Sequence, residues 1–301
     1  MQMGIVHSIG SEKVRLSLPK QLMRFMNEEY GISDRYLYLE NVIFRKMKNI
    51  KQIRIYPPKD NEAKVIVVYE MEDKELKVDN GHYLSVDLGL HNLFTCVDSV
   101  NGTTFIAGRK YLSITHYFDK EIGRIQSQWY SVQKTDHPKS SRHIQRLYEK
   151  KQNSVHDYLH KVTKNIANYC TENDISRVVI GDIKGIRENS DTGHMNNQKL
   201  HGLPYDQIYT MLEYKLKALG IKLIKQKESY SSQVSPLSPE VSKAYAEKSN
   251  RVKRGLYKDG CNEWNADVVG AYNILRKNKE TSAKIISPLM LTEPYVLKVA
   301  V

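Results

Sequence analysis

The order of apolar segments between residues 81 and 277 is the feature that most constrains how this chain can fold. Residues 81–108 contain three short, mostly apolar runs separated by turn residues. A further apolar run, VVIG, stands at residues 178–181, and another strand is predicted in IKLIKQKESY, residues 221–230. Short apolar runs bounded by glycine or asparagine are typical of strands. With the helices described next, the order is three strands, helices, strand, helix, strand, helix, which predicts an α/β domain.

Four helices are predicted between these strands. Two lie at residues 111–133 and 140–172, and the second has apolar residues on one side and many cations on the other. A third spans residues 205–220 and ends at a glycine, the residue most common just past a helix C-terminus. The last covers the end of CNEWNADVVGAYNILRK, residues 261–277, where apolar residues recur at helical spacing.

Residues 1–80 are predicted to form a separate, β-rich, barrel-like module. The segments KVRLSL, KQIRIYPP and AKVIVVYEME alternate between apolar and polar residues, as half-buried strands do. One short helix is predicted in this module, and it ends at Gly31.

The charge of the chain indicates a polyanionic partner. Among its 301 residues, 46 are Lys or Arg and 34 are Asp or Glu, which gives a net charge of +12. Nucleic acid is the usual partner of so basic a protein. We find no run of eighteen apolar residues and no signal peptide, so we expect a cytoplasmic, nucleoid-associated protein that does not bind membranes. Three widely spaced cysteines indicate reduced thiols.

Four carboxylates stand out by their positions: Asp87 lies within the first strand, Asp182 and Glu228 end later strands, and Asp267 starts the last helix. In α/β sheets the functional groups gather at strand ends. Carboxylates that converge there repel one another unless Mg²⁺ or Mn²⁺ lies between them, and two such ions can promote phosphodiester cleavage. A basic chain with an acidic centre therefore fits a nuclease.

Each of these acids also has a structural interpretation. Asp267 could cap the last helix, because Asp is favoured in a first helical turn. Asp182 could be a turn residue and Glu228 a surface charge. Asp87 is the most informative, since it lies inside an apolar strand where an unpaired charge is costly.

Five ordered motifs resemble those of the TnpB proteins encoded by bacterial insertion sequences, which are relatives of type V CRISPR effectors. The motifs are LSVDLGL, VVIGDIKGIREN, NNQKLHGLPYDQIYTMLEYKLKALGI, KESYSSQ and NADVVGAYNILRK. The resemblance implies a RuvC-type nuclease domain of RNase H-like fold at residues 81–277, after a partial oligonucleotide-binding-like module at residues 1–80 and before a C-terminal tail at residues 278–301. It also implies a guide RNA transcribed from the end of the element and Mg²⁺-dependent cleavage of complementary double-stranded DNA.

The resemblance assigns the catalytic and metal-binding acids only in part. It matches Asp87 to the family's acid in the first strand and Asp267 to its acid in the last helix. Where the family's middle motif has Glu, this chain has Gly181, so another acid must replace it. Asp182 is one position further along, where a strand side chain points to the other face. Glu228 follows the next strand, and we favour it slightly.

Two further departures concern the segments on either side of the motifs. Many members hold a four-cysteine zinc ribbon, but residues 234–262 contain only Cys261, so no zinc site is expected in this degenerate ribbon region. Arg251 and Arg254 in this region could contact phosphate, or the region could be a solvated loop. Compared with the family, the chain is also expected to be N-terminally short.

Nucleic-acid contacts are expected along the cationic helix and in the KESYSSQ motif. The candidates are Arg142, Arg146, Lys150, Lys151, Tyr230 and Gln233. Tyrosines among these cations could stack on unpaired bases or belong to the core. Two functions remain open: an RNA-guided DNA endonuclease, or a nuclease-deficient guided DNA-binding protein, which Gly181 favours. A transposase that joins strands fits less well, because no second catalytic domain is evident.

Overall fold

The computed structural model describes residues 4–58, 62–133, 135, 137–182, 202–253, 255–280 and 285–299. The chain divides into two compact units, residues 1–73 and 74–301. The functional assignment of the segments 1–80, 81–277 and 278–301 stays a prediction.

The first unit contains two small antiparallel sheets and one helix. Its elements are β1 (Ile5–His7), β2 (Lys13–Ser17), α1 (Lys20–Tyr30), β3 (Tyr36–Glu40), a 3₁₀ turn (Val42–Lys46), β4 (Lys48–Ile55) and β5 (Val65–Glu70). Strands β1, β2 and β3 form one sheet, and β4 pairs with β5. Val14, Leu16, Phe44 and Met47 form the buried core. Helix α1 ends at Gly31 in the left-handed conformation, as predicted.

The second unit is built on a six-stranded mixed sheet in the order β10-β9-β6-β7-β8-β13. Its elements are β6 (Tyr83–Leu88), β7 (Phe94–Asp98), β8 (Thr104–Ala107), α2 (Tyr111–Gln133), α3 (Arg142–Glu172), β9 (Arg177–Asp182), α6 (Tyr205–Lys217), β10 (Lys222–Lys227), β11 (Tyr257–Asp259), β12 (Asn262–Trp264), α7 (Ala266–Lys277) and β13 (Tyr295–Val296), with 3₁₀ turns at Lys243–Tyr245, Lys248–Asn250 and Pro288–Met290. Strands β6, β7 and β8 are antiparallel neighbours, whereas β9 and β10 run parallel to β6. The mixed α/β fold is thus confirmed.

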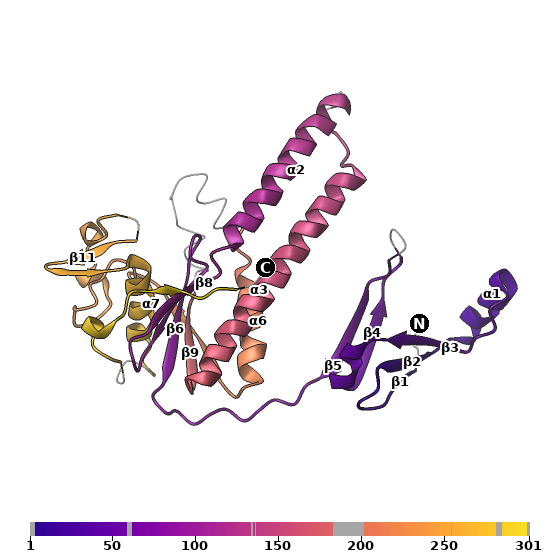
Figure 1. Ribbon diagram of the computed structural model, residues 1–301, viewed down its shortest axis with the longest axis horizontal. Helices are drawn as coiled ribbons and strands as arrows, with labels where there is room; N and C mark the ends of the chain where they lie inside the picture. Colours follow the sequence, from indigo (N-terminus) through magenta and orange to yellow (C-terminus); the bar gives the residue numbers. More distant parts are fainter. Residues whose placement is uncertain are drawn as a thin grey trace. The chain divides into compact units, whose positions relative to one another are not determined.

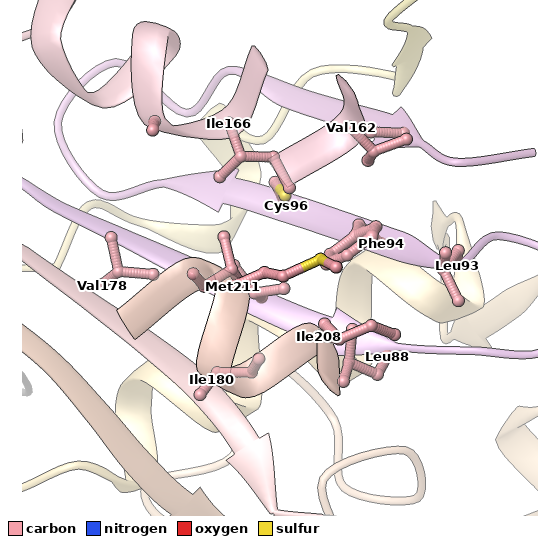
Figure 2. Packing of buried hydrophobic residues seen from close by; sticks show 14 of the residues in the cluster. Leu88, Leu93, Phe94, Cys96, Val162, Ile166, Val178, Ile180, Ile208 and Met211 are labelled. Carbon is pink, nitrogen blue, oxygen red and sulfur yellow. The ribbon is translucent and has the colours of Figure 1, made fainter. Parts of the chain in front are cut away.

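The two faces of this sheet are covered by different helices, which Figure 1 shows on either side of the strands. Along β6, Leu84, Val86 and Leu88 pack with residues of α3 and α6 in the main core. Figure 2 shows this core, with Met211 of α6 against Phe94 and Cys96 of β7. Successive strand residues point to opposite faces, so Asp87 belongs to the face that α7 covers.

Helices α2 and α3 form an antiparallel pair whose far halves extend beyond the sheet (Figure 1). The Ser141 hydroxyl caps α3 by accepting the N–H of Ile144 at 3.2 Å. Lys151 of α3 forms an ion pair with Asp119 of α2 at 2.5 Å. The helices predicted at residues 111–133 and 140–172 are confirmed, the second beginning two residues later.

The region expected to be a degenerate zinc ribbon contains the short hairpin of β11 and β12. Tyr257 and Trp264, one on each strand, are paired in register and are buried against Val269 of α7. The Tyr257 hydroxyl also donates to the backbone carbonyl of Gln233 at 3.2 Å. Aromatic burial therefore packs this hairpin onto α7.

Residues 285–299 run along the far edge of the sheet. β13 pairs with β8 in parallel, and Val299 is buried in the main core. Thr292 holds the segment before β13 against β8, since its hydroxyl accepts the N–H of Thr104 at 3.0 Å. In the part of the chain described, no helix is long and apolar enough to cross a membrane.

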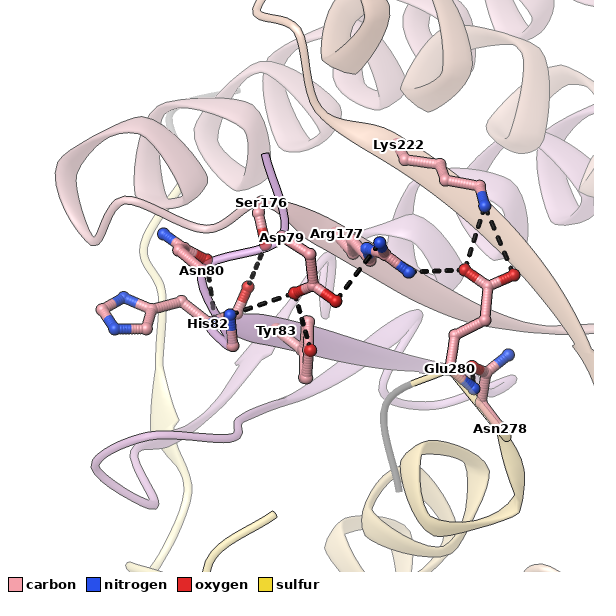
Figure 3. Close-up of polar contacts among 10 residues, drawn as sticks. Asp79, Asn80, His82, Tyr83, Ser176, Arg177, Lys222, Asn278 and Glu280 are labelled. Carbon is pink, nitrogen blue, oxygen red and sulfur yellow. Dashed lines mark hydrogen bonds and ion pairs between the residues drawn. The ribbon is translucent and has the colours of Figure 1, made fainter. Parts of the chain in front are cut away.

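A polar network ties the entry to β6 to the sheet and to the segment after α7 (Figure 3). Arg177 at the start of β9 lies between Asp79 at 3.2 Å and Glu280 at 2.5 Å. Tyr83 donates its hydroxyl proton to Asp79 at 2.7 Å, and Lys222 of β10 pairs with Glu280 at 2.9 Å. Three segments far apart in sequence thus meet around one half-buried guanidinium.

Replacing Arg177 with Ala should destabilise the protein measurably. The substitution leaves two carboxylates without their shared partner, and hydrogen bonds to charged groups are worth about 1.5–3 kcal/mol each. After allowance for partial exposure we expect a loss of about 1–2 kcal/mol, which lowers Tm by roughly 2–8 °C. Lys161→Ala, which breaks the exposed Lys161–Asp157 pair, is the control and should change Tm by less than about 2 °C. Equal shifts for the two variants would contradict this role.

Candidate active site

Three of the four predicted acids gather where α7 crosses the edge of the sheet. Asp87 lies near the carboxyl end of β6, and Glu228 directly follows β10. These two strands flank β9 and run parallel to it, so their carboxyl ends share one edge. Asp267 lies in the first turn of α7.

Glu228 fills the space that Gly181 leaves. A Cβ atom at residue 181 would overlap the Oε1 atom of Glu228. Lys227 of β10 pairs with Asp182 of β9, so the chain just after β10 reaches the end of β9. A carboxylate from the neighbouring strand therefore lies at the very position from which a residue-181 side chain would start.

Asp87 depends on a second glycine in a similar way. A Cβ atom at Gly270 of α7 would lie 2.5 Å from the Asp87 Oδ2 atom, far inside van der Waals contact. Since α7 is a helix, any larger residue here would push either the helix or the carboxylate aside. Gly270 thus sets how closely α7 approaches β6.

Asp267 is not the residue that caps α7. Asn265 is the N-cap, and its side-chain oxygen accepts the N–H groups of Asp267 at 3.0 Å and Val268 at 3.4 Å. The carboxylate of Asp267 accepts hydrogen bonds from Asn92 at 2.9 Å and from Arg251 at 3.3 Å. Its side chain is therefore available to the site and is held by two donors.

Burial and mutual repulsion disfavour the charged forms of these acids. Burial, and after it the charge of Asp267, raises the pKa of Asp87 to about 7, although Arg251 opposes the rise. Burial, followed by the charges of Asp87 and Asp182, raises the pKa of Glu228 to about 9. Such shifts are typical of sites that bind cations or exchange protons.

These donors suit a hard divalent cation. The Oε1 atom of Glu228 is buried and has no hydrogen-bond partner among the residues described, which is costly for a carboxylate. Mg²⁺ and Mn²⁺ prefer carboxylate oxygens and would satisfy this atom. Within the described part of the chain, no three His, Cys, Asp or Glu residues already stand together as a ligand set. Asp267 is at present bound to Asn92 and Arg251.

Asp182 belongs to the opposite face of the sheet. It is the last residue of β9, and Val178 and Ile180, which share its face, pack against α6. The Tyr205 hydroxyl of α6 lies 3.5 Å from its Oδ1 atom and donates to the carbonyl of Gly181 at 3.1 Å. The geometry therefore favours Glu228 over Asp182 as the third acid.

The polar face of α7 holds the loop that carries Glu228. Asn273 is fully buried, and its amide donates to the carbonyls of Ser231 at 2.8 Å and Val234 at 2.7 Å. Lys277 donates to the carbonyl of Ser229 at 2.7 Å. Sequence analysis missed these residues and Asn92, and the one available signal was an asparagine inside an apolar helix.

The predicted nucleic-acid contacts are scattered over several elements. Arg142, Arg146 and Lys150 are exposed along α3. Lys151 lies on the same helix and forms an ion pair with Asp119. Tyr230 is exposed and adopts a left-handed conformation with φ +67°. Gln233 lies near the base of the same loop and is half-buried. Arg251 forms an ion pair with Asp267, and Arg254 lies outside the described residues.

Comparison with known protein families gives two matches that lie one after the other on the chain. Residues 66–187 match OrfB_IS605, described as a probable transposase, and residues 205–274 match the TNB domain of Cas12f1-like proteins. These two matches are consistent with a TnpB-family protein. The two matches cover all four candidate acids, from Asp87 to Asp267.

Solved structures show that the fold of this chain occurs in larger proteins. A cryo-EM structure of a Cas12f1–sgRNA–target DNA complex matches 89% of this chain and 52% of its own, with 15% identity and a TM-score of 0.56. A CRISPR–Cas12f ternary complex matches 94% and 62%, with 15% identity and a TM-score of 0.51. The chain thus spans under two thirds of either protein. A search of curated protein sequences finds no match.

The metal-free protein should lose stability as the pH rises from about 5 to 9. Between the unfolded pKa values near 4 and the raised folded values of about 7 and 9, the native state binds more protons than the unfolded chain. The free energy of unfolding therefore falls with increasing pH. Glu228→Gln removes one of these groups and should raise Tm in EDTA at pH 8–9 by about 2 °C or more.

Thermal unfolding in EDTA from pH 5 to 9 measures this effect. Glu240→Gln, which alters an exposed acid, is the matched control and should follow the wild type. Parallel curves for the wild type and Glu228→Gln would mean that Glu228 is not held among repelling carboxylates.

Proposed function

We propose that this protein is an RNA-guided DNA endonuclease of the TnpB type that cleaves phosphodiesters by a two-metal carboxylate mechanism. Its second unit would be a RuvC-type nuclease domain of RNase H-like fold, and its first a partial, barrel-like oligonucleotide-binding module. The order of three antiparallel strands followed by two parallel strands and a closing helix supports the nuclease domain.

The observation that carries the proposal is the position of Glu228. Where Gly181 removes the family's usual acid, the carboxylate of Glu228 occupies the adjoining space and interacts with Asp87. The site would therefore keep three acids, with the third supplied by the residue after β10 and not by β9. Had Gly181 left an apolar void, loss of catalysis would be the better interpretation.

Asp87, Glu228 and Asp267 would hold the divalent ions, Mg²⁺ or Mn²⁺. When bound, such ions activate the attacking water and stabilise the charge on the leaving oxygen of a phosphodiester. Asp87 is the natural shared ligand, because the charge of Asp267 acts on Asp87 and the charge of Asp87 acts on Glu228. Asp182 remains a weaker candidate, whose charge acts on Glu228 from the other face.

The proposed partners are a guide RNA from the end of the element and double-stranded target DNA. The matching Cas12f1 structure is a complex with sgRNA and target DNA, which supports this assignment by similarity of fold. The exposed Arg142, Arg146 and Lys150 offer a cationic edge on α3 that fits a phosphate backbone. Base pairing would then supply the sequence specificity, in the cytoplasm at the nucleoid.

A nuclease-deficient guided DNA-binding protein is the second candidate. Gly181 favours it, because this residue cannot bind metal. The two candidates differ in one property only, which is whether Glu228 replaces the missing acid.

An exchange of acids between the two positions tests the proposal directly. The protein is co-expressed with its native flanking DNA, and Mg²⁺-dependent cleavage of labelled matching DNA is measured. Glu228→Gln should lower the cleavage rate on the order of 100-fold or more, as removal of an electrostatic catalytic group does. Gly181→Glu combined with Glu228→Ala should restore part of it, because the carboxylate returns to the same space from β9.

Asp182→Asn is the matched control and should retain most of the activity. If Asp182→Asn abolishes cleavage and Glu228→Gln does not, the third acid is Asp182. If the wild type binds guide RNA and matching DNA without cutting under any condition, the protein is a guided binder.

A further inference from the structure

Arg251 brings a permanent positive charge to the carboxylates of the candidate active site. Its Nη2 atom lies 3.3 Å from the Oδ1 atom of Asp267, and both side chains are about one third exposed. The same charge acts on Asp87 on β6, whose ionisation it favours. Arg251 directly follows a 3₁₀ turn, Lys248–Asn250, in the segment that joins the Glu228 loop to the β11–β12 hairpin.

The two halves of the site differ in how their oxygens are satisfied. On the side of Asp267, one carboxylate oxygen accepts from Asn92 at 2.9 Å and the other from Arg251. On the side of Glu228, the Oε1 atom is buried and has no hydrogen-bond partner among the described residues. A cation can therefore enter between Asp87 and Glu228 without breaking an ion pair, whereas one that binds Asp267 through Oδ1 must compete with Arg251.

We infer that Arg251 is an internal counter-cation of the site, which neutralises Asp267 while no metal is bound and is displaced when a divalent ion takes that carboxylate. This inference rests on the proposed metal-dependent function and adds to it an order of binding: the Asp87–Glu228 side fills first and the Asp267 side later. Arg251 is then a positioning residue for Asp267, in addition to any contact with phosphate.

The geometry separates this role from that of a phosphate contact alone. A side chain that served only to bind nucleic acid would have no effect on metal affinity in the absence of nucleic acid. A counter-cation lowers that affinity, because its ion pair with Asp267 must first be broken. An exposed pair of this kind should weaken metal binding at its site by about fivefold.

Titration of the full chain with Mn²⁺ alone, without RNA or DNA, tests the inference by calorimetry and by the rise in Tm. Arg251→Gln should bind the second Mn²⁺ ion, the one on the Asp267 side, about fivefold more tightly than the wild type does. Its Mn²⁺-induced rise in Tm should also be larger. In EDTA the same variant should have a lower Tm, because the carboxylates lose their counter-charge. Arg251→Lys keeps the charge and should resemble the wild type in both measurements.

Lys258→Gln is the matched control, since Lys258 pairs with Glu263 within the β11–β12 hairpin. It should leave Mn²⁺ binding unchanged. Equal or weaker Mn²⁺ affinity in Arg251→Gln than in the wild type would overturn the role of Arg251 and leave the proposed metal site standing. The absence of Mn²⁺ binding in every variant would overturn the metal site itself, and the inference with it.

Discussion

Repulsion among half-buried carboxylates is the constraint on which the rest of this structure depends. Asp87 lies inside the sheet, where burial and the charge of Asp267 oppose its ionisation, and its own charge opposes the ionisation of Glu228. Such an arrangement lowers stability unless cations or donors compensate it. Two glycines nevertheless preserve the crowding, since Gly270 lets α7 approach Asp87 and Gly181 lets Glu228 reach β9. A chain selected for stability alone has no reason to keep both.

The remaining parts of the second unit hold these acids in place. Asn265 caps α7 and so leaves Asp267 to the site, while the buried Asn273 fixes the loop after Glu228. The β11–β12 hairpin packs on α7 through Tyr257 and Trp264, and the segment before it supplies the cation that Asp267 binds. The helix is thus the common support for every acid except Asp87, which it covers.

The sequence was sufficient to predict the long helices and the central strands of the second unit, and it singled out the acids from which the site is proposed. Periodicity placed α3 near residues 140–172, because its apolar residues lie on one side of the helix over many turns. It could not reveal β13, a two-residue strand that exists only through its pairing with β8. Nor could it decide whether Asp182 or Glu228 lies beside Asp87, because that depends on how the Glu228 side chain, just after β10, reaches Gly181 on β9. The Arg251–Asp267 pair likewise depends on tertiary structure and follows no short-range pattern.

The position of the metal relative to Glu228 tests the account most directly. A crystal structure grown with Mn²⁺ and measured at the manganese absorption edge locates the ion by its anomalous scattering. The account predicts an ion bound by the carboxylates of Asp87 and Glu228, next to Gly181. An ion bound by Asp182, or a Glu228 side chain turned to solvent with no ion beside Asp87, would contradict it.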